Sequence, residues 1–86
     1  MKMYYIYVLQ SLKDNKLYYG FTRDLKERIK DHNNGRVKST QSRKPFKLVY
    51  FEKVDTIKEA RSKERYFKSG FGRKYVKRKL APSSNG

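Results

Sequence analysis

The segment KLYYGFTRDLKERIKDH, residues 16–32, changes character halfway along its length. Its first part, KLYYGF at 16–21, is dominated by aromatic residues, which are enriched in strands. In its second part Leu25 and Ile29 stand one helical turn apart among charged residues, the spacing of a helix with one buried side. We therefore expect a strand that leads directly into a helix over 23–33.

Both ends of this helix carry capping residues. Thr22 or Asp24 supplies the N-cap, and Asp24 precedes Glu27 with the spacing of a capping box. Asn34 and Gly35 follow the helix, and glycine at this point favours a stop. Local sequence alone therefore limits the helix on both sides.

A second aromatic and apolar run, MYYIYVLQ at 3–10, precedes this segment and is separated from it by the polar stretch SLKDN. Asp14 and Asn15 are typical turn residues, so the two runs predict an antiparallel hairpin. Loops of two or four residues give the same parity of strand pairing. Either loop places Tyr7 and Tyr18 on one face of the sheet.

The rest of the chain alternates between loops and regular elements. The segment 35–45 is polar and basic without periodicity, which indicates a loop able to follow a phosphate backbone. FKLVYFEKV at 46–54 predicts a third strand. A capping box at Thr56 opens a helix that we expect to end near Ser69, before Gly70. A short helix over 73–80 is expected to follow.

The order strand, strand, helix, strand, helix, helix predicts an α+β fold, in which helices flank a small three-stranded antiparallel sheet. With 86 residues, the chain is expected to form one domain over 1–80 and a disordered tail over 81–86. The absence of cysteine excludes disulfides and thiolate metal sites and suits a reducing cytoplasm. The apolar runs are too short for a membrane span or a signal peptide.

The charge is strongly unbalanced, with 23 lysines and arginines against 8 acidic residues and a net charge of +15. Such a field favours a polyanion, and nucleic acid is the first candidate because counterion release from phosphates provides affinity. An anionic membrane surface is less favoured, because the basic residues form no single amphipathic tract. A basic protein that is merely well solvated is the remaining alternative.

Glu64 breaks the pattern of the helix expected after Thr56. The apolar stripe of this helix contains Ile57, Ala60 and Phe67, and Glu64 falls near the centre of that stripe. Burial of an unpaired carboxylate is costly, so this position indicates a paired charge, a metal or a cleft. An ion pair with one of the many lysines or arginines is the simplest alternative to a functional role.

The helix over 23–33 carries the only histidine of the chain, His32, on the same side as Leu25. Arg28 lies one turn before His32 and can face the same sheet edge. Taken singly, the histidine could be a satisfied core residue and the arginine one solvated cation among many. The functional interpretation depends on these residues occurring together with the tyrosines and Glu64.

Phosphodiester hydrolysis requires groups of these types. A divalent metal needs a hard oxygen ligand, the attacking water needs a base, and the transition state needs cationic donors. Glu64, a strand tyrosine and Arg28 could supply these three functions, respectively. The residue set therefore favours a phosphodiester-cleaving site.

The same residues resemble a known family. YIY at 5–7 and YYG at 18–20, followed by Arg28 and His32, resemble the GIY-YIG nuclease family. The later segment KEARSKERYFKSG resembles the part of that family that carries its metal-binding glutamate, which would be Glu64. The resemblance extends over nearly all of the expected domain and agrees with the expected fold.

The resemblance implies a metal-dependent DNA endonuclease, with a divalent ion, Mg²⁺ or alternatively Mn²⁺, bound by Glu64. Tyr7 would be the general base or its proton relay. An ordinary phenol is protonated at neutral pH, so this role requires help. We expect it from the positive field, which would lower the pKa of Tyr7, and from a metal-bound water of lowered pKa.

The remaining site residues receive supporting roles from the same resemblance. Tyr18 would position the water or the phosphate, and Arg28 would bind the phosphate and stabilise its charge. His32 would form a hydrogen bond within the tyrosine pair or assist proton transfer. Gly20 would leave space for the backbone beside Tyr7.

The chain departs from the family pattern in three places. Tyr5 stands at the position of the first glycine, Tyr19 replaces the middle isoleucine, and the asparagine often found late in the module has no counterpart. Two alternatives therefore remain open. One is a DNA- or RNA-binding module without turnover, and the other is a subunit that positions nucleic acid for a larger nuclease complex.

Phosphate contacts are expected to provide most of the affinity, so sequence specificity is expected to be low. DNA is the expected partner, RNA and a protein partner are alternatives, and DNA repair or recombination is the expected setting. The cations expected to contact phosphates lie in the loop over 35–45 and near the last two helices. They are Lys38, Arg43, Lys44, Lys68 and Arg73.

Overall fold

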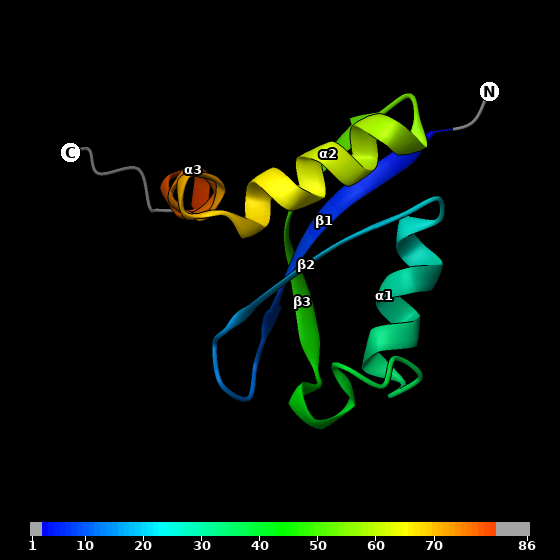
Figure 1. Ribbon diagram of the computed structural model, residues 1–86. Coiled ribbons are helices and arrows are strands. Elements are labelled where there is room, and N and C mark those ends of the chain that lie inside the picture. Colours follow the sequence, from blue (N-terminus) through cyan, green and yellow to red (C-terminus); the bar gives the residue numbers. More distant parts are fainter. Residues whose placement is uncertain (1–2, 81–86) are drawn as a thin grey trace.

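The structure, a computed structural model, describes residues 3–80 and confirms the expected α+β fold (Figure 1). The elements in chain order are β1 (Tyr4–Ser11), β2 (Leu17–Thr22), α1 (Leu25–Asn33), the short 3₁₀ helix η1 (Gln41–Arg43), β3 (Phe46–Val54), α2 (Ile57–Lys68) and α3 (Gly70–Leu80). The three strands form one antiparallel sheet in the order β2-β1-β3. The first strand of the chain is therefore its central strand.

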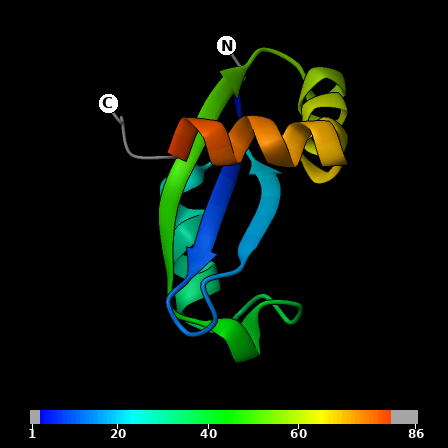
Figure 2. The same ribbon diagram turned by 90° about the vertical axis from the view of Figure 1, so that its left-hand side faces the viewer.

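The alternation of side chains along β1 divides the core into two clusters. Ile6 and Val8 point to one face, where they pack with Phe67 of α2 and Val76 of α3. Tyr7 and its neighbours on the other face belong to a second cluster, against which α1 packs. In Figure 2, α3 crosses in front of the strands and α1 lies behind them. The helices thus cover opposite faces of the sheet.

The pairing register of the hairpin agrees with the sequence-based expectation. Tyr7 pairs with Gly20, and Leu9 pairs with Tyr18. Residues that are directly paired in an antiparallel sheet share a face, so Tyr7 and Tyr18 lie on the same side. This is the side that α1 covers.

The expected helix caps are also present. The side chain of Asp24, not that of Thr22, caps α1 by accepting a hydrogen bond from the backbone N–H of Glu27 at 3.1 Å. Thr56 caps α2 in the same way at 3.1 Å. One expectation about α2 is wrong. Ile57, which we expected on the buried stripe of this helix, is 41% exposed, and the stripe is buried only from Ala60 onward.

The start of α3 differs from the expectation by three residues. We expected Gly70 to end the preceding helix and a new helix to begin at Arg73, but α3 begins at Gly70 itself. Ser69 explains the difference, because its extended backbone turns the chain and its hydroxyl accepts the N–H of Gly72 at 3.2 Å. A single serine therefore ends α2 and caps α3.

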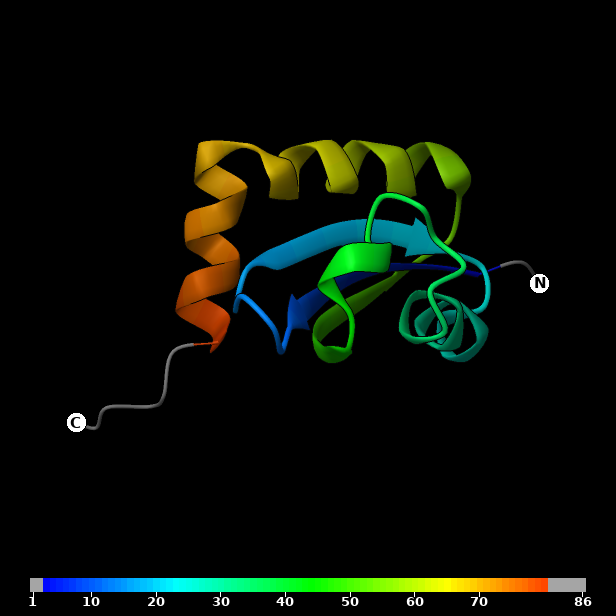
Figure 3. The same ribbon diagram turned by 90° about the horizontal axis from the view of Figure 1, so that it is seen from below.

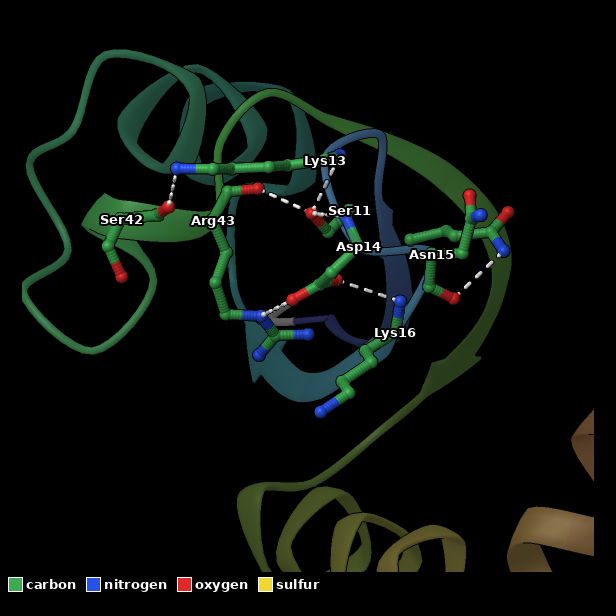
Figure 4. A network of polar contacts seen from close by, with 8 residues as sticks. Ser11, Lys13, Asp14, Asn15, Lys16, Ser42 and Arg43 are labelled. Atoms are coloured by element: carbon green, nitrogen blue, oxygen red, sulfur yellow. Dashed lines mark hydrogen bonds and ion pairs between the residues drawn. The ribbon is translucent and has the colours of Figure 1, made fainter.

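The loop expected over 35–45 is tied to the turn between β1 and β2 (Figure 4). Ser11 donates its hydroxyl hydrogen to the carbonyl oxygen of Arg43 at 2.6 Å. The Arg43 guanidinium pairs with Asp14 at 3.3 Å, and the Lys13 ammonium donates to the carbonyl oxygen of Ser42 at 3.2 Å. The end of this loop is therefore held in place.

Two sequence-based expectations concern the limits of the chain. The domain boundary at residue 80 stays a prediction, because the tail expected over 81–86 lies outside the described residues. Within residues 3–80, no helix is both long enough and apolar enough to cross a membrane.

The corner between α2 and α3 provides a test of the packing. A Cβ atom added at Gly72 would lie 1.8 Å from the carbonyl oxygen of Tyr66, a backbone atom that cannot move aside alone. We expect Gly72→Ala to lower the free energy of unfolding by about 1–3 kcal/mol or more, measured by urea denaturation.

Gly70→Ala is the matched control, because a Cβ atom there would meet nothing within 4 Å. Its expected effect is a change of less than about 1 kcal/mol. Equal destabilisation by both substitutions would contradict the tight packing at Gly72.

Candidate active site

The phenol of Tyr7 is the centre of the candidate site. Tyr7 lies on the central strand with 1% of its surface exposed, and its side chain passes over Gly20 of β2. A Cβ atom at Gly20 would lie 2.6 Å from the Tyr7 hydroxyl oxygen and 2.8 Å from Cζ. Gly20 therefore leaves space for the Tyr7 ring itself, where the sequence had suggested space for the backbone.

His32 of α1 is fully buried, and both of its ring nitrogens have partners. Its Nε2 lies 3.0 Å from the hydroxyl oxygen of Tyr7, and its Nδ1 lies 2.8 Å from the hydroxyl oxygen of Thr40. The Thr40 hydroxyl donates to the carbonyl oxygen of Val37 at 3.3 Å, so it is free to accept from Nδ1–H. This assigns the proton to Nδ1 and makes Nε2 the acceptor for the Tyr7 hydroxyl.

Three aromatic rings hold the imidazole in place. The ring centroid of His32 lies 5.0 Å from that of Tyr18 and 5.8 Å from those of Tyr7 and Phe46, with edge-on geometry in each case. Such arrangements are favourable for aromatic rings. The orientation of His32 is therefore fixed by packing as well as by hydrogen bonds.

His32 is neutral at physiological pH. Burial lowers the pKa of His32 to about 4, and the nearby positive charge of Arg28 contributes in the same direction. A neutral imidazole has one nitrogen with a free lone pair, which is what the hydrogen bond from Tyr7 requires. His32 can therefore accept a proton from Tyr7.

The pKa of Tyr7 differs from the sequence-based expectation. Burial raises it above its ordinary value, the charges of Tyr18 and Glu64 add to the increase, and the hydrogen bond from Arg28 only partly offsets it. We had expected the positive field to lower this pKa, which is wrong for the protein alone because loss of hydration outweighs the field. Tyr7 is therefore a protonated phenol in the free protein.

Arg28 lies one turn before His32 on α1 and reaches the same phenol. Its Nε donates to the Tyr7 hydroxyl oxygen at 3.4 Å, a long hydrogen bond, and its side chain is only partly buried. A partly exposed guanidinium can form paired hydrogen bonds to a phosphate. Arg28 thus combines a contact to Tyr7 with access from solvent.

Glu64 comes from α2, which runs alongside the edge strand β2 (Figure 3). Its carboxylate is close enough to Tyr7 to raise the pKa of that residue. It also forms an ion pair with Lys68 at 3.4 Å, with 24% of the Glu64 side chain and 53% of the Lys68 side chain exposed. The simple alternative of a paired charge is therefore present, in an accessible position where the pair is weak.

The donor set of the site fits a divalent metal only in part. Among residues 3–80 no three histidine or acidic side chains lie close enough together to hold a metal ion. Mg²⁺, however, is commonly bound through one or two carboxylates together with substrate phosphates and water. Glu64 alone could hold such an ion in company with a phosphate.

The five cations expected to contact phosphates have different environments. Lys38 and Lys44 are exposed, and Arg73 lines an open groove between the β1–β2 turn and α3. Lys68 is exposed but paired with Glu64. Arg43 is held by Asp14, and its guanidinium also lies 5.8 Å from the centre of the Phe46 ring. Lys38, Lys44 and Arg73 are therefore the better placed of the five.

Sequence reasoning missed Thr40 and Phe46 as parts of the site. Thr40 lies in a polar loop without periodicity, so nothing local marks it as buried. Phe46 is the first residue of β3 and was expected only as a strand residue. The sequence offers one signal for these residues: a histidine buried at the end of a helix needs polar partners, and the polar loop that follows the helix can supply them.

Comparison with known proteins identifies relatives that match most of the chain. The model of the GIY-YIG catalytic domain matches residues 3–78. A UPF0213 protein of Clostridium perfringens is 51% identical over 67 residues, which cover 77% of this chain and 71% of the relative. Another UPF0213 protein, from Staphylococcus saprophyticus, is 41% identical over 90% of this chain and 94% of its own length.

One solved structure supports the fold. The solution NMR structure of a UPF0213 protein from Bacillus halodurans has a TM-score of 0.54 and 32% sequence identity to this chain. The match covers 95% of this chain and 88% of that one. The fold is therefore shared along nearly the whole chain.

Thr40 offers a test of the proton assignment on His32. Thr40→Val removes the acceptor for Nδ1–H inside the protein, which we expect to cost about 1–3 kcal/mol of unfolding free energy. We also expect the imidazole ¹⁵N shifts to move away from a pure Nδ1–H tautomer. Thr40→Ser keeps the hydroxyl and should retain the original shifts. Unchanged shifts in Thr40→Val would contradict the assignment.

The low pKa of His32 predicts a pH dependence of stability. Between pH 6.5 and about 4 the unfolded chain binds a proton at His32 that the folded protein does not. The unfolding free energy is therefore expected to fall by on the order of 2–3 kcal/mol as pH drops through this window. Urea denaturation from pH 7 to 4 measures it. His32→Gln should lack this component, and identical pH profiles would refute it.

Proposed function

Because the chain belongs to the GIY-YIG family, which indicates a nuclease-type function, we propose that it is a metal-dependent endonuclease that hydrolyses phosphodiester bonds in DNA. The observation that carries this proposal is one hydrogen-bonded series, in which Arg28 and His32 both contact the phenol of Tyr7. Glu64 acts on the same phenol from another helix.

The proton path begins at Tyr7. Its hydroxyl hydrogen points to Nε2 of His32, so Tyr7 can take a proton from an attacking water while its own proton moves to Nε2. The resulting imidazolium keeps its Nδ1–H on Thr40. The proton returns through Tyr7 to solvent when the product leaves. Tyr7 is thus a relay, and the high pKa of its phenol is no obstacle.

The approach of the substrate makes this transfer easier. A phosphate beside Arg28 brings negative charge close to His32, which favours the protonated imidazole and raises its pKa above the value in the free protein. Arg28 stabilises the additional negative charge that develops on the phosphate during attack. Tyr18, packed against His32, is proposed to position the phosphate or the water.

A divalent ion, Mg²⁺ or Mn²⁺, would be held by Glu64 together with the substrate phosphate, and when bound it would supply positive charge and a more acidic water. Lys68 would give up its ion pair with Glu64 in this state. The affinity for DNA is proposed to come mainly from phosphate contacts of Lys38, Lys44 and Arg73, with low sequence specificity. A cytoplasmic role in DNA repair or recombination is part of the proposal.

A second candidate function is nucleic-acid binding without cleavage. One observation favours it: the Glu64 carboxylate already has a partner, Lys68, and among residues 3–80 it belongs to no group of three acidic or histidine side chains that could hold a metal ion. The missing late asparagine agrees with this alternative. The two candidates differ in whether the protein cleaves the nucleic acid that it binds.

The deciding experiment is the nicking of supercoiled plasmid and of branched DNA with Mg²⁺, with Mn²⁺ and with chelator. We expect metal-dependent cleavage that falls by about 100-fold or more in Tyr7→Phe and Glu64→Gln, since each substitution removes a group that acts in the transition state. Glu27→Gln, which removes an exposed carboxylate from α1, is the charge-matched control and should cleave normally.

The substitution Lys68→Ala distinguishes a role of Glu64 as the ion-pair partner of Lys68 from a role in cleavage. If Glu64 serves only to pair with Lys68, both substitutions should have the same small effect on cleavage and on stability. Under the proposed function, Lys68→Ala keeps activity and Glu64→Gln loses it. Binding of DNA without metal-dependent cleavage would favour the second candidate.

A further inference from the structure

A groove opens beside the N-terminal turn of α1, on the face of the sheet that carries Tyr7. It is open to solvent and has a volume of about 600 Å³. Two aromatic rings, Tyr5 and Phe51, line it from the sheet. Three cations, Arg23, Lys26 and Lys53, surround them. The groove thus combines flat apolar surface with positive charge.

The aromatic pair has a free surface. The ring centroids of Tyr5 and Phe51 are 6.2 Å apart with an angle of 55° between the planes, too close and too tilted to admit another ring between them. Phe51 is 47% exposed, so part of its ring is open toward solvent. A planar apolar group could therefore stack on the outside of the pair.

The cations around the pair are available to a ligand. All three are exposed, and within residues 3–80 none of them forms an ion pair. The guanidinium carbon of Arg23 also lies 5.9 Å from the ring centre of Tyr4, which packs with the core cluster on the other face of the sheet. The one acidic residue of the groove, Asp24, is already used to cap α1. The groove therefore retains a net positive charge.

The groove adjoins the candidate active site. Tyr5 is two residues before Tyr7 on β1, so both side chains point to the same face. Phe51 pairs directly with Tyr7 across β1 and β3. A strand whose phosphate lies at Arg28 could therefore continue into the groove.

The chemistry of the groove selects one kind of occupant. A nucleotide that is not base-paired offers a flat face for stacking and a phosphate on each side, which matches an aromatic pair surrounded by cations. A base within a duplex has its faces covered by its neighbours. A protein partner would have to cover three free cations with few apolar contacts.

We propose that this groove binds an unpaired base of a nucleic-acid strand beside the cleavage site. The proposal deepens the proposed function and rests on it for the nature of the ligand. It makes the preferred substrate a DNA that contains a single-stranded segment, such as a branch or a flap. Phe51 and Tyr5 supply the stacking surface, and Arg23, Lys26 and Lys53 bind the flanking phosphates.

The test compares the binding of three oligonucleotides by fluorescence anisotropy at fixed salt: a single strand, the same strand made abasic, and a duplex. The wild-type protein should bind the single strand about tenfold more tightly than its abasic counterpart, because stacking is lost in the latter. The double variant Tyr5→Leu, Phe51→Leu should lose this preference and keep its duplex affinity.

Phe71→Leu is the matched control, because Phe71 is 79% exposed but does not line the groove. It should retain the preference for the single strand. The salt dependence of binding should be the same in all variants, because no cation is removed.

Three results would overturn the proposal: equal wild-type affinity for the abasic strand, an equal loss of duplex binding in the double variant, or the same loss in Phe71→Leu. The measurement needs no cleavage. If stacking is observed while the plasmid assay shows no cutting, the proposed nuclease function fails and the base-binding groove stands. Cleavage of the plasmid without any preference for the single strand over the abasic strand refutes the base-binding groove and leaves the nuclease function standing.

Discussion

The hydrogen bonds of the buried His32 side chain connect three parts of the chain that are distant in sequence. Tyr7 on the central strand, His32 on α1 and Thr40 in the following loop meet at one imidazole ring. In the free protein, burial favours a neutral ring in this position, with a partner for each nitrogen. The backbone of the same loop is fastened to Ser11 at the end of β1. The loop is therefore required for the site to form.

Burial keeps Tyr7 and His32 uncharged in the free protein, although the charged groups around them leave an excess of positive charge. Most acidic side chains of the described residues are already occupied: Asp24 caps a helix, and Asp14, Asp31, Glu52 and Glu64 each pair with a lysine or arginine. The remaining positive field, part of a net charge of +15, lacks an internal counterion. A bound polyanion would supply the missing negative charge. It would also change the protonation equilibria of Tyr7 and His32, which are set by burial in the free protein.

Sequence-based predictions were accurate where they depended on residues close together in the sequence, and less so where they depended on contacts between distant residues. Hairpin register and the caps at Asp24 and Thr56 depend on near neighbours, and they were predicted correctly. The start of α3 at Gly70 was not, because one serine serves two helices and glycine had been interpreted only as a stop. The roles of Thr40 and the pKa of Tyr7 depend on burial and on contacts between distant elements, which the order of residues does not contain.

Because Tyr7 packs closely over Gly20, its side chain loses conformational entropy when the protein folds and not when a ligand binds. The ring passes over the strand at a point where even one added carbon atom would collide with it, and its hydroxyl is held by two partners. The rotational freedom of this side chain is therefore lost when the protein folds. Binding of a ligand to the folded protein therefore does not include the entropic cost of ordering the Tyr7 side chain, which favours a higher affinity.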